Sequence, residues 1–175
     1  DKALSYDDRQ AREMVEAARR LNFGLLAGSS LPVTWRRPEA ELPLESPLDE
    51  AVVAFGYERG VWEIYFFHAL ETLQCMLERR SGGETGVRRV RMLSGNDVWR
   101  AGERGQWSWE LLHAALARSP SCNVGEVQDN VTQPEAILID YVDGTRGAAI
   151  NLPGHVSDFT FAARLEGGEL PTTTL

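Results

Sequence analysis

The segment that most constrains the fold is residues 136–152, which read AILIDYVDGTRGAAINL. Two runs rich in apolar residues, Ala136–Val142 and Thr145–Leu152, flank the dipeptide Asp143-Gly144. An Asp-Gly pair between two such runs is the strongest short-range signal of a β-hairpin, because both residues of its tight turn tolerate a positive φ. The segment therefore predicts two antiparallel neighbours in a sheet.

Further strands and helices are predicted on either side of this hairpin. Short apolar runs predict strands at about residues 50–57, 87–92 and 159–165. Helical spacing of apolar residues predicts helices at about residues 62–79 and 106–118. This order predicts an α+β fold, with an open, mostly antiparallel sheet covered by helices on one face.

The first thirty residues have a different pattern. Apolar residues from Ala11 to Leu21 recur at helical spacing, and a short apolar strand is predicted at 23–27, ending in the loop Gly28-Ser29-Ser30. Helix and strand together make half of a βαβ unit. Four prolines between residues 32 and 47 predict a linker. We expect an N-terminal piece at 1–31, a linker at 32–47 and an α+β domain at 48–175.

Composition limits the partners. The net charge of −8 argues against nucleic acid, whose phosphates attract a positive surface. No apolar run approaches the roughly 20 residues that a membrane span needs. The two cysteines form no CxxC pair, which favours a reducing, cytoplasmic compartment. Because the chain begins at Asp1 and enters a helix soon afterwards, we expect it to be a piece of a longer protein.

Three segments in the same order resemble the Gfo/Idh/MocA oxidoreductases. Residues 1–5 (DKALS), followed by a helix and FGLLAGSS, resemble the end of that family's dinucleotide-binding domain, where Glu-Lys-Pro-Leu-Ala precedes a helix. His68-Ala69-Leu70-Glu71 resembles the His-x-x-Asp element of the substrate domain, and residues 137–153 resemble the late strands. The resemblance covers most of the chain through the order of its parts.

The resemblance implies a function. It predicts the last helix and strand of a Rossmann-type α/β domain, followed by an α+β domain whose open sheet binds a small-molecule substrate and forms homo-oligomers. The implied activity is hydride transfer between NAD or NADP and a sugar- or cyclitol-like hydroxyl. The sequence contains no G-x-G-x-x-G. We therefore expect the cofactor site to lie largely outside this chain, which would be inactive alone.

Lys2 and His68 are the catalytic residues that the resemblance implies. A cation such as Lys2 would stabilise the charge that develops on the reacting oxygen. A histidine titrates near neutral pH, so His68 can exchange a proton with a hydroxyl. Ala3 stands where the family has proline. The alternatives are an exposed lysine and a core histidine with a structural partner.

The usual carboxylate partner of the histidine is missing from its expected position. Ile64 occupies the place, four residues before His68, where many family members have aspartate. Glu63 points away from His68 by about 140° on a helix, so it substitutes only if the helix begins late. Glu71 lies three residues after His68 and can share its face. It either orients the imidazole or balances charge.

The loop after the predicted strand contributes weaker candidates. Ser29, Ser30, Trp35 and Arg36 lie in or after the Gly28 loop, where polar side chains would border the substrate cleft. The alternative is a turn followed by a surface arginine. No metal site is predicted, because no set of ligands has the required spacing. With Ile64 and Ala3 in place, the protein is alternatively a non-catalytic scaffold, or a ligand-binding or dimerisation domain that keeps the oxidoreductase shape.

Overall fold

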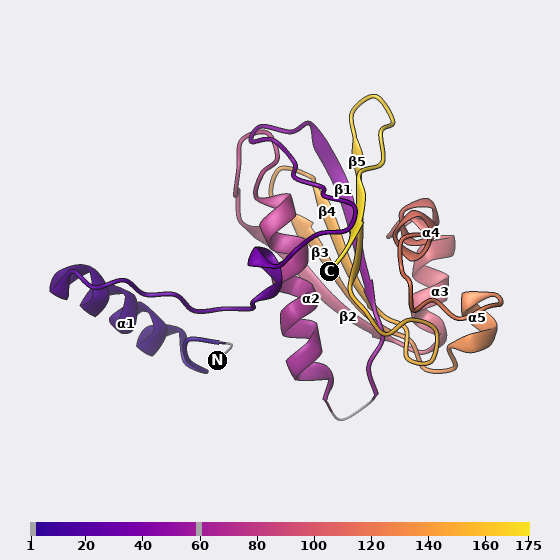
Figure 1. Cartoon of the computed structure of the whole chain (residues 1–175), viewed down its shortest axis with the longest axis horizontal. Coiled ribbons are helices and arrows are strands. Elements are labelled where there is room, and N and C mark those ends of the chain that lie inside the picture. The colour runs from indigo at the N-terminus through magenta and orange to yellow at the C-terminus, as the bar shows by residue number, and fades with distance from the viewer. Residues whose placement is uncertain (1–2, 59–60) are drawn as a thin grey trace.

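The computed structural model describes residues 3–58 and 61–175 and contains one six-stranded sheet (Figure 1). The strands are β1 (Leu48–Phe55), β2 (Val87–Ser94), β3 (Glu135–Tyr141), β4 (Arg146–Asn151), β5 (Thr160–Leu165) and β6 (Thr172–Thr174). The helices are α1 (Asp8–Leu21), α2 (Trp62–Leu77), α3 (Asn96–Glu103), α4 (Trp109–Leu116) and α5 (Val127–Asn130), with a 3-10 turn at Leu31–Val33.

The sheet is open and mixed, in the order β2-β3-β4-β1-β5-β6. Only β1 and β4 run parallel among the paired strands described, and the other neighbours are antiparallel. The predicted hairpin is confirmed, since β3 and β4 pair from Glu135↔Asn151 to Asp140↔Arg146. Asp143 accepts a hydrogen bond from the Thr145 amide at 2.8 Å within the turn. The predicted α+β class is therefore correct.

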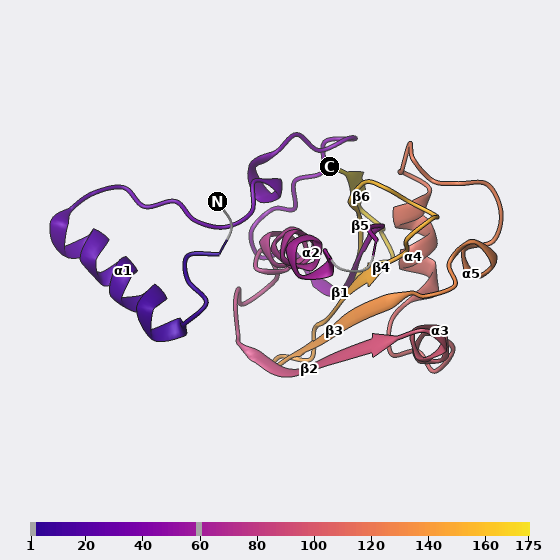
Figure 2. The ribbon, with the colours of Figure 1, turned by 90° about the horizontal axis from the view of Figure 1, so that it is seen from below.

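Helices cover both faces of this sheet, so the prediction of a single covered face was wrong. Figure 2 shows α2 on one side of the strands and α3 and α4 on the other. The cause is visible in β1, whose residues Ala51, Val53 and Phe55 face α2 while Val52 and Ala54 face α4. Because successive side chains alternate between faces, a continuous apolar run marks a strand buried on both sides.

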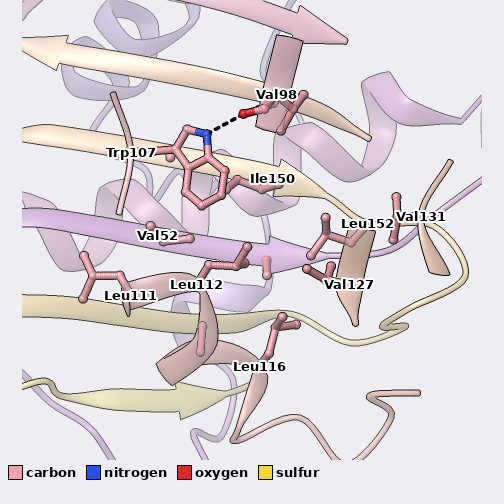
Figure 3. Close-up of a cluster of buried hydrophobic side chains, with 14 of the residues drawn as sticks. Val52, Val98, Trp107, Leu111, Leu112, Leu116, Val127, Val131, Ile150 and Leu152 are labelled. Atoms are coloured by element: carbon pink, nitrogen blue, oxygen red, sulfur yellow. Dashed lines mark hydrogen bonds between the residues drawn. The ribbon is translucent and has the colours of Figure 1, made fainter. Parts of the chain in front are cut away.

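Each face of the sheet has its own hydrophobic core. On the α3 and α4 side, aliphatic residues pack around Trp107, whose ring centroid lies 4.6 Å from that of Trp109. The Trp107 indole nitrogen donates to the Val98 carbonyl at 2.9 Å (Figure 3). On the α2 side, Phe55 contacts Phe66 edge-to-face at 4.9 Å and stacks on Phe159 at 5.5 Å between ring centroids. The aromatic core therefore lies directly beneath the helix that carries His68.

The N-terminal helix is confirmed, but the strand predicted after it is not formed. Asp7 caps α1 by accepting from the Gln10 amide at 2.9 Å, and Asn22 ends the helix in the left-handed conformation. Residues 23–27 are extended without pairing to a strand, and Leu26 is 91% exposed. In both views α1 projects away from the sheet (Figures 1 and 2). A strand needs a neighbour for its backbone hydrogen bonds, and the described residues supply none here.

The proline-rich segment packs against the α+β unit. Its Arg37 pairs with Thr174 through two backbone hydrogen bonds of 2.9 Å, and Thr173 donates its hydroxyl to the Pro38 carbonyl at 2.7 Å. Leu42 is buried with α2. This path brings the Gly28 loop back against the exposed side of α2, where His68 lies.

Candidate functional site

A cleft of about 500 Å³ lies between the Gly28 loop and α2. A volume of this size suits a small molecule. Residues of the two segments line it: Leu26, Ala27, Gly28, Ser29, Ser30, Pro32, Val33, His68 and Glu71. Four of the predicted site residues, the two serines with His68 and Glu71, therefore come together at one place.

Ser29 and His68 form a close polar contact in the cleft. The Ser29 hydroxyl oxygen lies 2.6 Å from His68 Nδ1, although the two residues are 39 positions apart. The same oxygen accepts from the Leu31 amide at 3.0 Å, which fixes the serine at the start of the 3-10 turn. His68 is half-buried. The imidazole is therefore held by a loop residue that is itself fixed to the backbone.

Glu71 approaches the same loop at Gly28. A Cβ atom added to Gly28 would lie 2.9 Å from Glu71 Oε2, and Gly28 has a φ of +120°. Glycine is thus required both for the backbone conformation and for the close approach of the carboxylate. Among the residues that the structure describes, Glu71 has no hydrogen-bond or ion-pair partner, and its side chain is half-buried.

Aromatic rings adjoin His68 away from the loop. The Phe159 ring meets the imidazole edge-on at 6.2 Å between centroids, and the Tyr65 ring lies at 6.4 Å. Tyr57 stacks on Tyr65. Burial raises the pKa of Tyr57, with Tyr65 and Asp158 adding to the effect, so this phenol stays protonated at neutral pH. Tyr65 was not among the predicted site residues, although its position three residues before His68 places both on one helix face.

Trp35 and Arg36 lie outside this cleft, contrary to their proposed role beside the other candidates. Trp35 is 88% exposed and borders a separate hollow of about 250 Å³. Arg36 donates to the carbonyls of Pro32 and Ala40 and contacts Cys75 Sγ at 3.9 Å, so it fastens the proline-rich segment to α2. Burial raises the pKa of the Cys75 thiol, although Arg36 opposes the shift. That thiol is therefore protonated at neutral pH.

For two predicted site residues the structure gives no side-chain position. Lys2 lies outside the described residues. Glu63 falls within α2, which begins at Trp62, so the late helix start that would turn it toward His68 does not occur. The structure does not describe the side chain of Glu63. Ile64, at the position of the missing aspartate, is 42% exposed.

A second polar network lies in the loops at the far end of β4. His155 is buried, with Nδ1 2.9 Å from Asn130 Nδ2 and Nε2 3.4 Å from Cys122 Sγ. Burial lowers the pKa of His155, which keeps the ring neutral at pH 7. Among the described residues, no group of three or more His, Cys, Asp or Glu side chains can hold a metal ion. The network therefore joins two loops.

The described residues do not fit a dinucleotide. β2 leads into α3 through a single glycine, Gly95, and Asp97 lies in the first turn of that helix. A carboxylate there repels a phosphate at the helix N-terminus. The glycine-rich stretch 82–86 follows the end of α2, where a helix presents carbonyl groups.

Comparisons with protein-family models, curated proteins and solved structures find no match. In the described part of the chain, no helix combines the length and apolar character needed to cross a membrane.

Proposed function

We propose that this chain supplies the substrate side of an oxidoreductase-type active site. In this proposal the cleft between the Gly28 loop and α2 binds a small hydroxyl-bearing molecule, and His68 exchanges a proton with its hydroxyl. The observation that carries the proposal is the 2.6 Å contact between Ser29 and His68 in a cleft of about 500 Å³. Resemblance of His68-Ala69-Leu70-Glu71 to an oxidoreductase element supports the same assignment.

The contact with Ser29 has a consequence for the protons of the imidazole. The serine oxygen already accepts from Leu31, and its own proton has His68 Nδ1 as the acceptor within reach. A neutral imidazole has one donor and one acceptor nitrogen, so a proton accepted at Nδ1 places the ring proton on Nε2. In this tautomer His68 donates to a substrate carbonyl through Nε2. Toward a hydroxyl it acts as a base in the other tautomer, in which Nδ1–H donates to the Ser29 oxygen and Nε2 accepts the proton.

A redox cofactor must be held elsewhere. NAD or NADP would supply the hydride acceptor when bound, but the described residues do not form its phosphate site. We expect the chain alone to bind neither dinucleotide. Titration with NADH, followed by its fluorescence, tests this expectation, and binding at micromolar concentration would contradict it.

The site assignment is tested by ligand binding. Calorimetric titration of a panel of polyols and hexoses should give binding to the wild-type chain that falls at least about tenfold in His68→Ala, equivalent to about 1.4 kcal/mol. His113→Ala is the matched control, because His113 is exposed on α4 across the sheet. Equal loss in both variants, or no loss in either, would remove His68 from the site.

A second proposed role is self-association through the edge of the sheet. On β2, Val90 is 58% exposed and Met92 is 48% exposed. They stand opposite Ile139 and Ile137 of β3, so the four side chains share one face. An apolar face on an edge strand is typical of an interface. We propose that a second copy of the chain covers it.

Sedimentation equilibrium tests this role. The wild-type chain should associate, and Val90→Glu should shift it to monomer because a buried carboxylate in the interface has no partner. Val124→Glu is the control, since Val124 is 98% exposed in a loop away from β2. A monomeric wild-type protein at the highest accessible concentration would refute the proposal.

A further inference from the structure

The described lining of the cleft contains an acidic group but no lysine or arginine. Its lining contains one carboxylate, Glu71, one imidazole, His68, and the hydroxyls of Ser29 and Ser30, while its remaining residues are apolar or glycine. The chain as a whole also carries a net charge of −8. Such a site repels carboxylates and phosphates and attracts cations.

Glu71 is placed to meet a ligand. It has no hydrogen-bond or ion-pair partner among the described residues, yet it is half-buried against the Gly28 loop. Arg36, which follows the cleft-lining segment in the sequence, is bonded to backbone carbonyls and to Cys75. A half-buried carboxylate that lacks a protein counter-ion gains most from a ligand that brings one.

We infer that the cleft selects a hydroxylated amine, with Glu71 binding the ammonium group while His68 and Ser29 face the hydroxyl. This inference rests on the proposed function, because it names the substrate class of the same site. Glu71 lies one helical turn from His68, so the two groups contact neighbouring positions of one small ligand. A neutral polyol retains the hydroxyl contacts but lacks the charge-assisted bond, and an acidic analogue meets repulsion from Glu71.

The test uses three hexoses that differ in charge at neutral pH, namely glucosamine, glucose and glucuronate. Calorimetry should show glucosamine binding at least tenfold more tightly than glucose, and glucuronate more weakly than either. In Glu71→Gln the ratio of glucosamine to glucose affinity should fall to near one. Glu78→Gln is the charge-matched control, because Glu78 is exposed at the end of α2 outside the cleft.

The outcomes distinguish failure of the substrate class from failure of the proposed site. If glucose and glucosamine bind equally to the wild-type chain, or the preference survives Glu71→Gln, the inference is overturned while the proposed site stands. If glucuronate binds as tightly as glucosamine, the inference is likewise overturned. If none of the three binds, both the inference and the proposed function fail. The wild-type preference should also decline as salt is raised from 0.05 M to about 0.5 M.

Discussion

Two polar regions along α2 differ in how fully their groups are bonded. Near its C-terminus lies the Arg80 cluster, formed by Arg80, Thr85, Tyr141 and Asp143. Arg80 is 1% exposed and donates to Asp143 at 2.7 Å, to the Leu77 carbonyl at 2.8 Å and to Thr85 at 3.0 Å. In the cleft, by contrast, Glu71 has no such partner among the described residues.

Tyr141, the aromatic residue of the Arg80 cluster, is also bonded within the protein. The guanidinium lies 4.5 Å above the centre of the Tyr141 ring, and the Tyr141 hydroxyl donates to Gln74 at 2.6 Å. Burial raises the pKa of Tyr141 to about 12. Polar groups that satisfy one another stabilise the fold and leave little for a ligand, whereas the cleft retains groups with bonding capacity. A cluster of polar side chains is therefore a candidate binding site only where its groups retain hydrogen-bonding capacity for a ligand.

The largest expected effect is on stability, from Arg80→Leu. Removing the buried arginine takes its donor from Asp143, the Leu77 carbonyl and the Thr85 hydroxyl, so we expect the free energy of unfolding to fall by about 3 kcal/mol. Urea denaturation measures it. Arg100→Leu is the control, because Arg100 pairs with Asp97 on the surface, and its loss should cost less than about 0.5 kcal/mol. Similar costs for both variants would contradict the comparison.

The next effect is on the cleft, from Gly28→Ala. A side chain at a φ of +120° is strained and would displace Glu71, so we expect a cost of about 1 kcal/mol and a roughly tenfold loss of hexose affinity. Calorimetry with glucosamine measures the affinity. Gly24→Ala is the control, since a Cβ there meets nothing within 4 Å. Unchanged affinity in Gly28→Ala would place the ligand elsewhere.

The smallest effect is on the acid limb of stability. Burial alone would raise the pKa of Asp143, but hydrogen bonds from Thr145, Arg80 and Thr85 outweigh it and hold that pKa below its usual 3.8. A depressed pKa stabilises the folded state above about pH 4 and loses that contribution as the pH falls toward the folded pKa. Between pH 4 and 2 the wild-type chain should therefore lose about 1 kcal/mol more than Asp143→Asn. Parallel acid profiles would contradict this.

The sheet was largely predictable because its signals are local. The Asp143-Gly144 turn predicted β3 and β4, and the apolar run of residues 62–79 predicted α2, each to within a few residues of the observed bounds. Two helices and one strand were missed. The helix α3 (Asn96–Glu103) combines Asn, Asp, Arg and Gly in a short stretch, and α5 (Val127–Asn130) is a single turn. The strand β6 (Thr172–Thr174) forms by pairing with β5. The side of the sheet that α4 covers depends on packing between distant segments.

The site was predictable in its members but not in its geometry. His68 and Glu71 share a helix face, and helical spacing alone indicated this. The contact of Ser29 with His68 joins residues 39 positions apart, and it depends on the path of the proline-rich segment, which no local pattern fixes. For the same reason Trp35 and Arg36, although close to Ser29 in sequence, face away from the cleft.

The most direct test of the central claim is a map of backbone amide shifts by nuclear magnetic resonance while glucosamine is added. If the cleft is the ligand site, the largest chemical-shift changes should occur at the amides of Gly28, Ser29, His68 and Glu71. The amide shifts of the Arg80 cluster should not change. Changes centred on the Arg80 cluster, or no saturable change at any amide, would contradict the account.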